Sequence, residues 1–504
     1  MELRPTPIPR NLASAPVLSQ ARWLGPKDVT VTGVTLDSRR VMAGDLYAAL
    51  PGSHTHGARF WEAAKELGAV AILTDVDGER AITDGGDPGI TLVVVTDPRR
   101  ILGDLAAWIF DHPGADMKLV GITGTNGKTT MSYVVGDILA AAGHEVGIIG
   151  TIGIRIGHEE IPSQRTTPES PDVHRLLAVM RERGVTAVAM EVSSHALALG
   201  RVDGVLFDVA VFTNLSQDHL DFHGSMDEYF AVKSTLFEPT RSRIGLVCID
   251  DSWGARLASA AHVPVTTYGL ESWAQWTLRD VHVGAAGTWS AQAVGPDRHV
   301  DLKCSLPGRF NHANVLGGFV AASQLGVPDE AGRQAIEAFA GVPGRMEVID
   351  GPFAAFVDYA HTPDAVVTAL AAAREFGTGR ILAALGCGGD RDRGKRSQMG
   401  RVASMAADVL VITDDNPRSE DPALIRQEML SGAGSGTAQV IEIGDRGTAI
   451  QYLVDQAQAD DVVLILGKGH EQGQHIGDQI LQFDDRTVLA QAIKAAHTAG
   501  EGSK

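Results

Sequence analysis

The strongest chemical signal in the sequence is the glycine-rich segment GITGTNGKTT, residues 121–130. It follows an apolar run, and we expect Lys128, Thr129 and Thr130 to open a helix. Backbone N–H groups in such a turn, together with the positive end of the helix, hold polyphosphate. The segment predicts an ATP site in which Lys128 reaches the β- and γ-phosphates and a threonine hydroxyl binds Mg²⁺. Ile122 stands where the motif usually has its first glycine, so a tight turn without a ligand is the alternative interpretation.

Two further polar residues are expected near this segment. Glu191 ends the predicted strand TAVAMEV, and His219 follows the predicted strand VAVFTNL. Ligands of open α/β sheets bind at the carboxyl ends of strands. A carboxylate and an imidazole in that position could hold a magnesium ion that bridges the phosphates. Histidine is an unusual magnesium ligand, so a structural role for His219, and a satisfied strand-end carboxylate at Glu191, stay open.

A sheet is needed to bring these residues together, and the sequence predicts one. The runs LVGITGT, VGIIGTIGI, TAVAMEV, VAVFTNL and IGLVCID are nearly continuous apolar segments, as expected for buried parallel strands. One intervening helix has Ser170 as its predicted N-cap, Pro171 at its first position, and apolar residues at i, i+3, i+4 and i+7 from Val173. This alternation indicates a doubly wound parallel sheet.

The chain of 504 residues is too long for one core and is expected to form about three domains. Short apolar runs and helical stretches predict a small α/β unit over residues 1–115, closed by the polar segment DHPGADMK. A second boundary is expected near GVPGRM, residues 341–346. We therefore predict domains at 1–115, 116–343 and 344–504, the last a Rossmann-like α/β domain.

The composition argues against several classes of function. The 43 basic and 62 acidic residues give a net charge of −19, which disfavours nucleic acid or an anionic membrane surface as a partner. Cys248, Cys304 and Cys387 are too far apart for a zinc motif or a disulfide framework, as expected in a reducing cytoplasm. The N-terminal segment MELRPTPIPRNL lacks the apolar region of a signal peptide. No apolar run reaches the roughly 20 residues of a membrane span. We predict a cytoplasmic protein without membrane insertion.

Taken together, the motifs resemble the Mur ligase family and its folylpolyglutamate synthetase relatives. GTNGKTT is followed in family order by EVSSHAL (191–197), FTNLSQDHLDFHGSMDEYFAVK (212–233), LPGRFNHANVLG (306–317) and VDYAHTPDA (357–365). The resemblance implies a uridine-binding N-terminal domain, a central phosphate-loop domain and a C-terminal Rossmann-like domain. It also implies a monomeric ligase that uses ATP and Mg²⁺.

The resemblance assigns residues to the nucleotide and the metal. Lys233 by itself is typical of a solvated helical lysine behind Ser225 as N-cap, but the matching family lysine is carbamylated and binds a second magnesium ion. A lysine with an ordinary pKa near 10.4 is protonated and does not react with CO₂, so carbamylation requires a lowered pKa. The implied catalytic residues are Lys128, Lys233 and Arg345. The implied metal ligands are Thr129, Glu191, His219 and carbamylated Lys233. The implied ATP-binding residues are Gly124, Thr125, Asn126, Gly127, Lys128, Thr129, Thr130, Asn311, Asn314, Arg345, Asp358, Tyr359 and His361.

Three segments resemble family blocks for the UDP-sugar-peptide, the first that of enzymes adding the third or fourth stem-peptide residue and the other two those of the enzyme adding the third. They are TLDSRRVMAGDLYAALPG (35–52), RTTPES (165–170) and SSHALALGR (193–201). Some members have glutamine where this chain has Leu199, so that contact is not transferred. The residues implied to bind the UDP-sugar-peptide are Leu36, Ser38, Thr166, Thr167, Ser193, Arg201 and Lys233.

The amino-acid substrate is indicated by GCGGDRDRGKR (386–396), DNPRSEDP (415–422) and GKGHEQ (467–472). The branch that adds diaminopimelate carries DNPR. A guanidinium at Arg418 suits the second carboxylate of that substrate and would repel the ammonium of lysine. Glu471 is a candidate partner for the distal ammonium. An Asn-Pro loop turn without a ligand is the alternative. The implied diaminopimelate-binding residues are Arg391, Asp415, Asn416, Pro417, Arg418, Gly467 and Glu471.

These assignments predict an ATP-dependent amide ligase for peptidoglycan precursors. It would add meso-diaminopimelate to UDP-N-acetylmuramoyl-L-alanyl-D-glutamate through an acyl phosphate, with closing domains that exclude water. The alternatives are a lysine-adding enzyme, a dipeptide-adding family member, a folylpolyglutamate synthetase, and a regulatory or scaffold protein that binds ATP without ligating anything.

Overall fold

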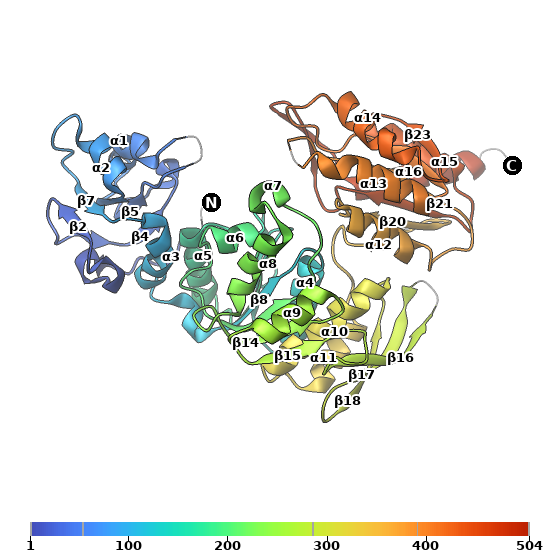
Figure 1. Ribbon diagram of the computed structural model, residues 1–504, viewed down its shortest axis with the longest axis horizontal. Helices are drawn as coiled ribbons and strands as arrows, with labels where there is room; N and C mark the ends of the chain where they lie inside the picture. Colours follow the sequence, from blue (N-terminus) through green and yellow to red (C-terminus); the bar gives the residue numbers. More distant parts are fainter. Residues whose placement is uncertain (1–2, 53–54, 285–286, 391, 502–504) are drawn as a thin grey trace.

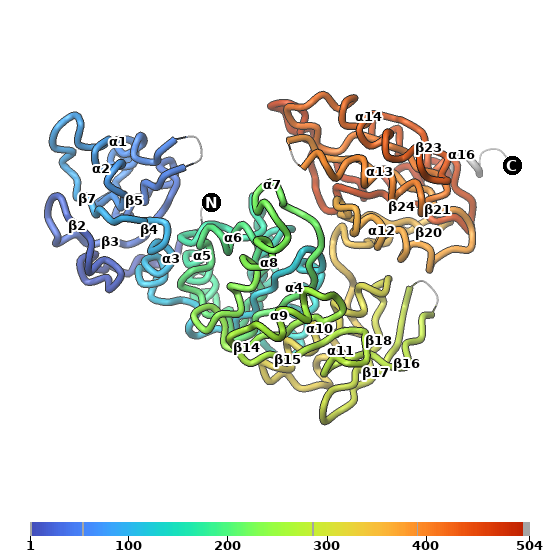
Figure 2. The backbone as a smooth tube through the Cα atoms, viewed as in Figure 1, coloured from blue at the N-terminus to red at the C-terminus, as the bar shows by residue number. Residues whose placement is uncertain are grey.

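Three sheet-containing units follow one another along the chain (Figure 1). The computed structural model describes residues 3–501 apart from 53–54, 285–286 and 391. The N-terminal and C-terminal units lie on either side of the central unit, and the colours of Figure 2 pass through the three units in order. None of the helices in these described ranges is long and apolar enough to cross a membrane.

The N-terminal unit has a five-stranded sheet in the order β2-β7-β6-β5-β4, parallel except for β2. Helix α3 covers one face, and α1 and α2 cover the other. The strands are β2 (Arg22–Leu24), β4 (Gly33–Thr35), β5 (Asp45–Ala48), β6 (Ala71–Thr74) and β7 (Thr91–Val94), beside a small pair of β1 (Arg10–Asn11) and β3 (Thr30–Val31). The helices are α1 (Trp61–Glu66), α2 (Val76–Thr83) and α3 (Pro98–Ile109).

The central unit has an eight-stranded sheet in the order β11-β10-β9-β12-β8-β13-β14-β15. The six strands from β9 to β15 in this order are parallel, as predicted. The prediction for VGIIGTIGI was wrong in part, because Gly150 N–H donates to Gly153 O and turns the chain, so that β10 runs antiparallel to β9. The strands are β8 (Lys118–Thr123), β9 (Val146–Ile149), β10 (Ile154–Ile156), β11 (Glu159–Ile161), β12 (Ala187–Glu191), β13 (Phe207–Phe212), β14 (Ser242–Cys248) and β15 (Val265–Tyr268).

Helices cover both faces of this sheet because alternate strand residues point to opposite sides. Val120 and Ile122 pack with α4, α10 and α11, whereas Leu119 packs with α5, α8 and α9. Ser225 caps α8 as predicted, since its side chain accepts from Glu228 N. The helices are α4 (Lys128–Ala141), α5 (Ser170–Glu182), α6 (Ser194–Ala198), α7 (Leu220–His223), α8 (Met226–Ser234), α9 (Ser252–Ala260), α10 (Arg309–Gln324) and α11 (Asp329–Glu337).

Two features of the central unit differ from the sequence prediction. The N-cap of α5 is Glu169 rather than Ser170, and its carboxylate is used by arginines instead of by the helix. An antiparallel sheet of β16 (Thr277–Val283), β17 (Trp289–Val294) and β18 (His299–Cys304) was not predicted. Its alternate residues Trp289, Ala291 and Ala293 are buried in the same core as α10.

The C-terminal unit has a six-stranded sheet in the order β19-β20-β24-β21-β22-β23, parallel except for β19. Helices α12, α13 and α14 cover one face, and α15 and α16 cover the other. The strands are β19 (Glu347–Val348), β20 (Ala354–Asp358), β21 (Ile381–Leu385), β22 (Val409–Ile412), β23 (Gln439–Glu442) and β24 (Val462–Leu466), with a hairpin of β25 (Gly473–Ile476) and β26 (Gln479–Gln482). The helices are α12 (Pro363–Ala373), α13 (Gly394–Ala406), α14 (Pro422–Ala433), α15 (Arg446–Gln456) and α16 (Asp485–Glu501).

A fully buried ion pair joins α15 to α16. Arg446 Nε and Nη2 each lie 2.7 Å from a carboxylate oxygen of Asp485, and both side chains are 0% exposed. Arg446 Nη2 also donates to Leu466 O at 2.8 Å, at the end of β24. The pair therefore ties both helices to the strand end that carries GKGHEQ.

We expect Arg446→Met to lower the free energy of unfolding of the C-terminal unit by about 3–5 kcal/mol, because Asp485 would be left as an unpaired buried charge. The control is Arg374→Met, which breaks a half-exposed pair with Asp408 at 2.9 Å and is expected to cost about 0–1 kcal/mol. Urea unfolding followed by circular dichroism measures both changes. Equal destabilisation by the two substitutions would contradict the importance of the buried pair.

Candidate functional site

The glycine-rich segment forms a loop between β8 and α4, as predicted. Gly124 has φ +147° and Gly127 has φ +86°, and Gly127 is the N-cap of α4. A Cβ on Gly124 would lie 1.9 Å from Thr213 Oγ1, and one on Gly127 would lie 2.4 Å from Asn314 Oδ1. Only glycine fits these positions, because both the backbone angle and the space exclude a side chain. The resulting turn presents the amino end of a helix of 14 residues, which attracts an anion.

Residues at the end of β13 hold this loop, and the sequence prediction missed them. Asn214 Oδ1 accepts from Asn126 N at 2.9 Å, and Thr213 Oγ1 donates to Asn126 O at 2.6 Å. Thr125 N donates to Asn214 O at 2.9 Å. Their signal in the sequence is the position of FTN directly after the strand next to β8.

Lys128 and Glu191 are the charged groups beside the loop. Lys128 Nζ donates to Gly124 O at 2.9 Å and to Thr125 O at 2.8 Å. Burial lowers the pKa of Lys128, and the charge of Glu191 opposes that shift. The Glu191 carboxylate accepts from Thr151 N at 2.8 Å and from Thr151 Oγ1 at 2.9 Å. Thr151 was not predicted, and it fixes both oxygens of a carboxylate that is 1% exposed.

The residues assigned to the substrate peptide meet Glu191 from the other side. Thr166 Oγ1 lies 3.0 Å from Thr151 Oγ1, and Thr167 Oγ1 donates to Glu191 O at 2.8 Å. Ser193 N donates to Thr167 Oγ1 at 3.1 Å. The predicted peptide site therefore adjoins Glu191, which lies opposite Ile122 of β8 directly before the nucleotide loop.

Three arginines surround Glu169 where the N-terminal and central units meet. Arg99 of α3 lies 3.3 Å from the Glu169 carboxylate, Arg165 lies 2.6 Å from it, and the predicted substrate residue Arg201 lies 3.0 Å from it. Burial lowers the pKa of Arg201. The charge of Glu169 opposes this shift, and the charges of the two other arginines add to it. Three cations against one carboxylate leave positive charge at this boundary, which suits an anionic substrate.

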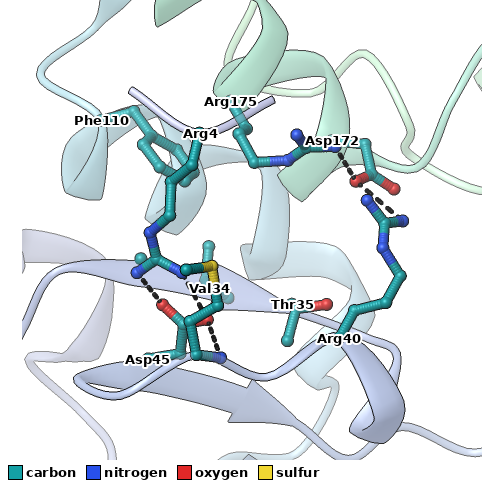
Figure 3. Close-up of a pocket in the computed structure, with 10 residues that line it drawn as sticks. Arg4, Val34, Thr35, Arg40, Asp45, Phe110, Asp172 and Arg175 are labelled. Carbon is teal, nitrogen blue, oxygen red and sulfur yellow. Dashed lines mark hydrogen bonds and ion pairs between the residues drawn. The ribbon is translucent and has the colours of Figure 1, made fainter. Parts of the chain in front are cut away.

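The predicted uridine residues lie on the N-terminal side of the same boundary. Leu36 and Ser38 follow β4, and the side chain of Asp37 between them accepts from Arg39 N at 3.0 Å. Figure 3 shows an adjoining pocket in which Arg40 reaches Asp172 of α5 at 3.4 Å. Ion pairs also line this pocket between Arg175 and Asp172 and between Arg4 and Asp45. Of these pairs, the one between Arg40 and Asp172 joins the first unit to α5, which places the two halves of the predicted UDP-sugar-peptide site side by side.

Lys233 is buried, and its interpretation as a solvated helical lysine was wrong. Its side chain is 1% exposed, and Nζ donates to Gly124 O at 2.9 Å and lies 4.7 Å from the centre of the Tyr229 ring. Burial lowers the pKa of Lys233 well below its ordinary value, and nearby Lys128 lowers it further, although Asp218 opposes the shift. The residue lies in α8, whose first turn alone was visible in the sequence.

The donor set near the loop suits magnesium in part. Glu191 offers a carboxylate, and Thr129, a residue that is 4% exposed, offers a hydroxyl. Such oxygen atoms suit Mg²⁺, which keeps water and phosphate oxygens as its remaining ligands. His219 has φ +54° and lies 3.4 Å from Asp218, so its ring is engaged by a neighbour. Among the residues with described positions, three or more His, Cys, Asp or Glu side chains gather nowhere closely enough for a metal.

Arg345 reaches from the linker into the nucleotide loop. Its Nη2 donates to Thr129 Oγ1 at 3.2 Å, and its guanidinium lies 4.3 Å from the centre of the Tyr359 ring. Both oxygens of Asp358 accept backbone N–H groups, from Met346 at 2.7 Å and from Ala360 at 2.8 Å. The carboxylate of Asp358 therefore holds the linker in the position from which Arg345 enters the site.

The other predicted nucleotide residues flank this linker. Asn314 Nδ2 donates to Asn311 Oδ1 at 3.0 Å behind the loop, and Asn311 Nδ2 donates to Pro307 O at 2.7 Å. His361 lies 4.6 Å from the Tyr359 ring, and burial lowers the pKa of His361 to about 4. The assigned groups of the central unit and of the third sheet thus meet at one place.

The residues assigned to diaminopimelate form a second cluster at the carboxyl ends of β22 and β24. Asn416 Nδ2 donates to Glu471 Oε2 at 2.8 Å. Arg418 has φ +54°, and its Nη1 donates to Gly389 O at 2.6 Å. Positive φ at a non-glycine residue carries strain and concentrates at functional sites. Arg391 lies outside the described residues. The remaining members, Asp415, Pro417 and Gly467, lie in the two loops that meet here.

The fold and these two clusters define a class: an α/β protein with a phosphate loop on one sheet and an amino-acid-sized polar site on the next. Three family models match, described as "Mur ligase family, catalytic domain" at residues 30–107, "Mur ligase middle domain" at 122–322 and "Mur ligase, glutamate ligase domain" at 344–469. The chain belongs to the Mur ligase family, which confirms the resemblance.

Relatives cover nearly the whole chain. The UDP-N-acetylmuramoyl-L-alanyl-D-glutamate–2,6-diaminopimelate ligase of Streptomyces avermitilis is 48% identical over 97% of this chain and 98% of its own length. The enzyme of the same name from Corynebacterium glutamicum is 45% identical over 92% of each chain. A solved structure of that name is 32% identical, covers 93% of this chain and 95% of its own, and has a TM-score of 0.65. MurF from Acinetobacter baumannii, at 18% identity, covers 91% and 96% with a TM-score of 0.66 and shares the fold. The predicted fold class is confirmed.

We expect Gly124→Ala to remove most of the stabilisation of the protein by ATP, because the new Cβ displaces Thr213 and distorts the loop. ATP with Mg²⁺ at a hundred times its dissociation constant stabilises a native protein by about 2.7 kcal/mol, and a hundredfold weaker site leaves about 0.4 kcal/mol. The control is Gly143→Ala, which also changes a glycine of positive φ but meets nothing within 4 Å. Thermal unfolding with and without ATP reads the difference. A full ATP-induced shift in Gly124→Ala would contradict the assignment of the loop.

Proposed function

We propose that this chain is an ATP-dependent amide ligase that joins meso-2,6-diaminopimelate to UDP-N-acetylmuramoyl-L-alanyl-D-glutamate. The observation that carries the proposal is the position of Glu191, which lies opposite Ile122 of β8, directly before the phosphate loop. The backbone O of Glu191 also accepts from Thr167 of the predicted peptide site. A reaction between a peptide carboxylate and ATP requires these two sites to be adjacent. The names of the relatives at 45–48% identity support the same substrates.

The reaction has two steps. A carboxylate oxygen of the D-glutamate residue attacks the γ-phosphorus of ATP, the bond to the β-phosphate oxygen breaks, and ADP leaves. The amine of diaminopimelate then attacks the acyl phosphate, loses a proton and expels phosphate, which leaves an amide. Water would hydrolyse the acyl phosphate, so closure of the units around the site protects it.

The phosphates bind at residues 124–130 in this proposal. Lys128 leaves the carbonyl groups of Gly124 and Thr125 and turns to the β- and γ-phosphates. Arg345 neutralises charge on the phosphoryl group as it moves, since it already contacts Thr129 in the same loop. Asn311, Asn314, Asp358, Tyr359 and His361 hold the adenosine side and the linker.

Magnesium would be held by Thr129, Glu191, His219 and carbamylated Lys233. When bound, the ion supplies positive charge to the phosphate oxygens. Lys233 becomes a carbamate when its neutral amine attacks CO₂ and loses a proton. The buried position of Lys233 favours the neutral amine, because burial disfavours the ammonium form.

The UDP-sugar-peptide spans the first two units. Leu36 and Ser38 bind the uridine, while Thr166, Thr167, Ser193 and Arg201 bind the peptide. The peptide carboxylate then lies near Glu191 and Lys233. We assign the region 1–115 to the nucleotide-sugar, 116–343 to ATP and 344–504 to the amino acid. The enzyme acts as a monomer in the cytoplasm, where ATP and UDP-linked precursors are made.

Diaminopimelate binds at the second cluster. Arg418 pairs with the carboxylate of the distal amino-acid head, and Glu471 receives its ammonium with Asp415 and Asn416 beside it. Arg391, Pro417 and Gly467 complete the site. A guanidinium offers parallel N–H donors to a carboxylate, and lysine, which lacks that carboxylate, would leave Arg418 unpaired.

The assignment predicts that phosphate release requires meso-diaminopimelate and that L-lysine gives background rates. Arg418→Met should lower kcat/KM for diaminopimelate by about 100-fold, equivalent to about 2.7 kcal/mol. It should leave the rate with lysine unchanged or higher. Phosphate release with ATP, Mg²⁺ and UDP-N-acetylmuramoyl-L-alanyl-D-glutamate measures both values. The control is Arg393→Met, an exposed arginine of the same region that pairs with Glu428 at 2.7 Å. Equal use of lysine by the native enzyme would sink the choice of amino acid and keep the ligase.

The carbamate predicts an unusual response of Lys233 variants. Lys233→Ala should lower phosphate release by about 10²- to 10³-fold. Added formate should restore part of it, because a small carboxylate can occupy the space of the lost carbamate. Lys233→Arg keeps a cation and should stay inactive with or without formate. Activity retained by Lys233→Arg, or no response of Lys233→Ala to formate, would show that the residue acts as a plain lysine.

A further inference from the structure

Lys468 is a fully buried lysine in the loop that follows β24. It lies between Gly467, with φ +113°, and Gly469, with φ +54°, and its side chain is 0% exposed. Lysine is almost never fully buried unless its charge is paired. The sequence prediction used Gly467 and Glu471 of GKGHEQ and gave Lys468 no role.

The ammonium of Lys468 joins two segments of the amino-acid cluster, the loop of Asn416 and the stretch from Glu471 to Gly473. Nζ lies 2.6 Å from Gly473 O, 3.0 Å from Asn416 Oδ1 and 3.1 Å from Glu471 Oε2. Asp415 Oδ1 is 3.7 Å away. An ammonium has three hydrogens, and three acceptors within 3.1 Å use them all. Lys468 therefore acts on a substrate only through the groups that it holds.

One consequence is the orientation of the Asn416 amide. Its Oδ1 accepts from Lys468 Nζ and from His475 N, each at 3.0 Å. Its Nδ2 must then face Glu471, to which it donates at 2.8 Å. Without the ammonium of Lys468, the amide loses the stronger of the two donors that fix its direction.

A second consequence is the net charge of the cluster. Asp415 and Glu471 carry two negative charges and Lys468 carries one positive charge, so the three sum to −1. The neighbouring Arg446–Asp485 pair is neutral as a unit. Arg418 of the same cluster adds +1 on the side proposed for the carboxylate, so that the net −1 of these three residues matches one ammonium group and Arg418 matches one carboxylate. Removal of Lys468 would place two carboxylates together in a buried site, where their repulsion is costly.

We propose that Lys468 is a positioning residue for the amino-acid substrate: it orients Asn416 and Glu471 and adjusts the charge of the cluster to receive one ammonium head. The inference rests on the proposed function, since it takes this cluster as the site of the incoming amino acid. It concerns the second ammonium of the substrate, which diaminopimelate and lysine both carry beside the amine that reacts, and so it does not depend on the choice between these two amino acids.

The test compares Lys468→Met, Glu471→Gln and the double variant in the full-length enzyme by steady-state phosphate release. Lys468→Met should raise KM for the amino acid at least 30-fold and change KM for ATP less than twofold. It should lower kcat by a smaller factor than the factor by which it raises KM for the amino acid. The double variant should have a KM no more than twofold above that of the worse single variant, because Lys468 acts through Glu471. Lys303→Met, at an exposed lysine paired with Glu337, is the matched control and should leave all constants unchanged.

Several outcomes overturn the inference. An unchanged KM for the amino acid does so, as does a parallel rise of KM for ATP, which indicates a general loss of structure. A double variant whose effect is the product of the two single effects shows that Lys468 acts independently of Glu471. If Lys468→Met does not fold, the double variant is compared with Glu471→Gln: equal KM supports the inference, and a further tenfold rise overturns it.

The native enzyme separates this inference from the proposed function. Phosphate release with meso-diaminopimelate supports both and makes that amino acid the variable substrate. Release with L-lysine alone overturns the choice of diaminopimelate, and Lys468 is then tested through KM for lysine. Release with neither amino acid overturns the proposed function and the role of Lys468 together.

Discussion

Charge removed from water at the carboxyl ends of parallel strands is the constraint on which the rest of this structure depends. Parallel strands bring loops together at one edge, and each loop here carries a charged group that needs a partner. In the central unit, the cationic side chains exceed the carboxylates, since Lys128, Lys233 and Arg345 face Glu191 and Asp218. The excess positive charge can bind a polyphosphate. In the third unit, Asp415 and Glu471 outnumber Lys468, which leaves room for an ammonium. The two sheets thus present opposite charge to two reactants that must meet.

The linker and the GKGHEQ loop connect these two sites. A Cβ on Gly344 would lie 2.1 Å from His470 N, so linker and loop are in direct backbone contact. Tyr359 packs between the guanidinium of Arg345 and the ring of His470, at 4.3 and 5.3 Å. A shift of the third sheet would therefore move Arg345 relative to the phosphate loop. In the same way, movement of the nucleotide would displace the loop that carries Lys468. This contact gives domain closure a defined mechanical route in the proposed ligase.

Sequence reasoning succeeded where a feature depends on neighbours along the chain. The loop with Gly124 and Gly127, the start of α4 at Lys128 and the end of β12 at Glu191 all follow from local patterns. It failed where a distant segment decides. The N-cap of α5 is Glu169 rather than the predicted Ser170, and the carboxylate of Glu169 is held by arginines from other elements. The segment around Lys233 by itself indicated a solvated lysine, although the loop after β8 covers it. The run VGIIGTIGI was predicted to lie in a parallel strand, although it forms the hairpin of β9 and β10, because apolar runs do not reveal strand direction.

The sequence by itself determined the phosphate loop and the alternation of strands and helices, because glycine turns and apolar spacing act over a few residues. The resemblance of its motifs, in their order, indicated the Mur ligase family. The tertiary structure decided which groups are partners. The sequence prediction missed the roles of Thr151, Asn214 and Lys468, because these roles depend on which strands are neighbours in the sheets. For example, β12 lies between β8 and β9, and β24 lies between β20 and β21. A buried lysine and an exposed lysine look alike in a sequence. The acceptors that surround Nζ of Lys468 come from segments more than 50 residues apart, and only the folded chain brings them within hydrogen-bonding distance.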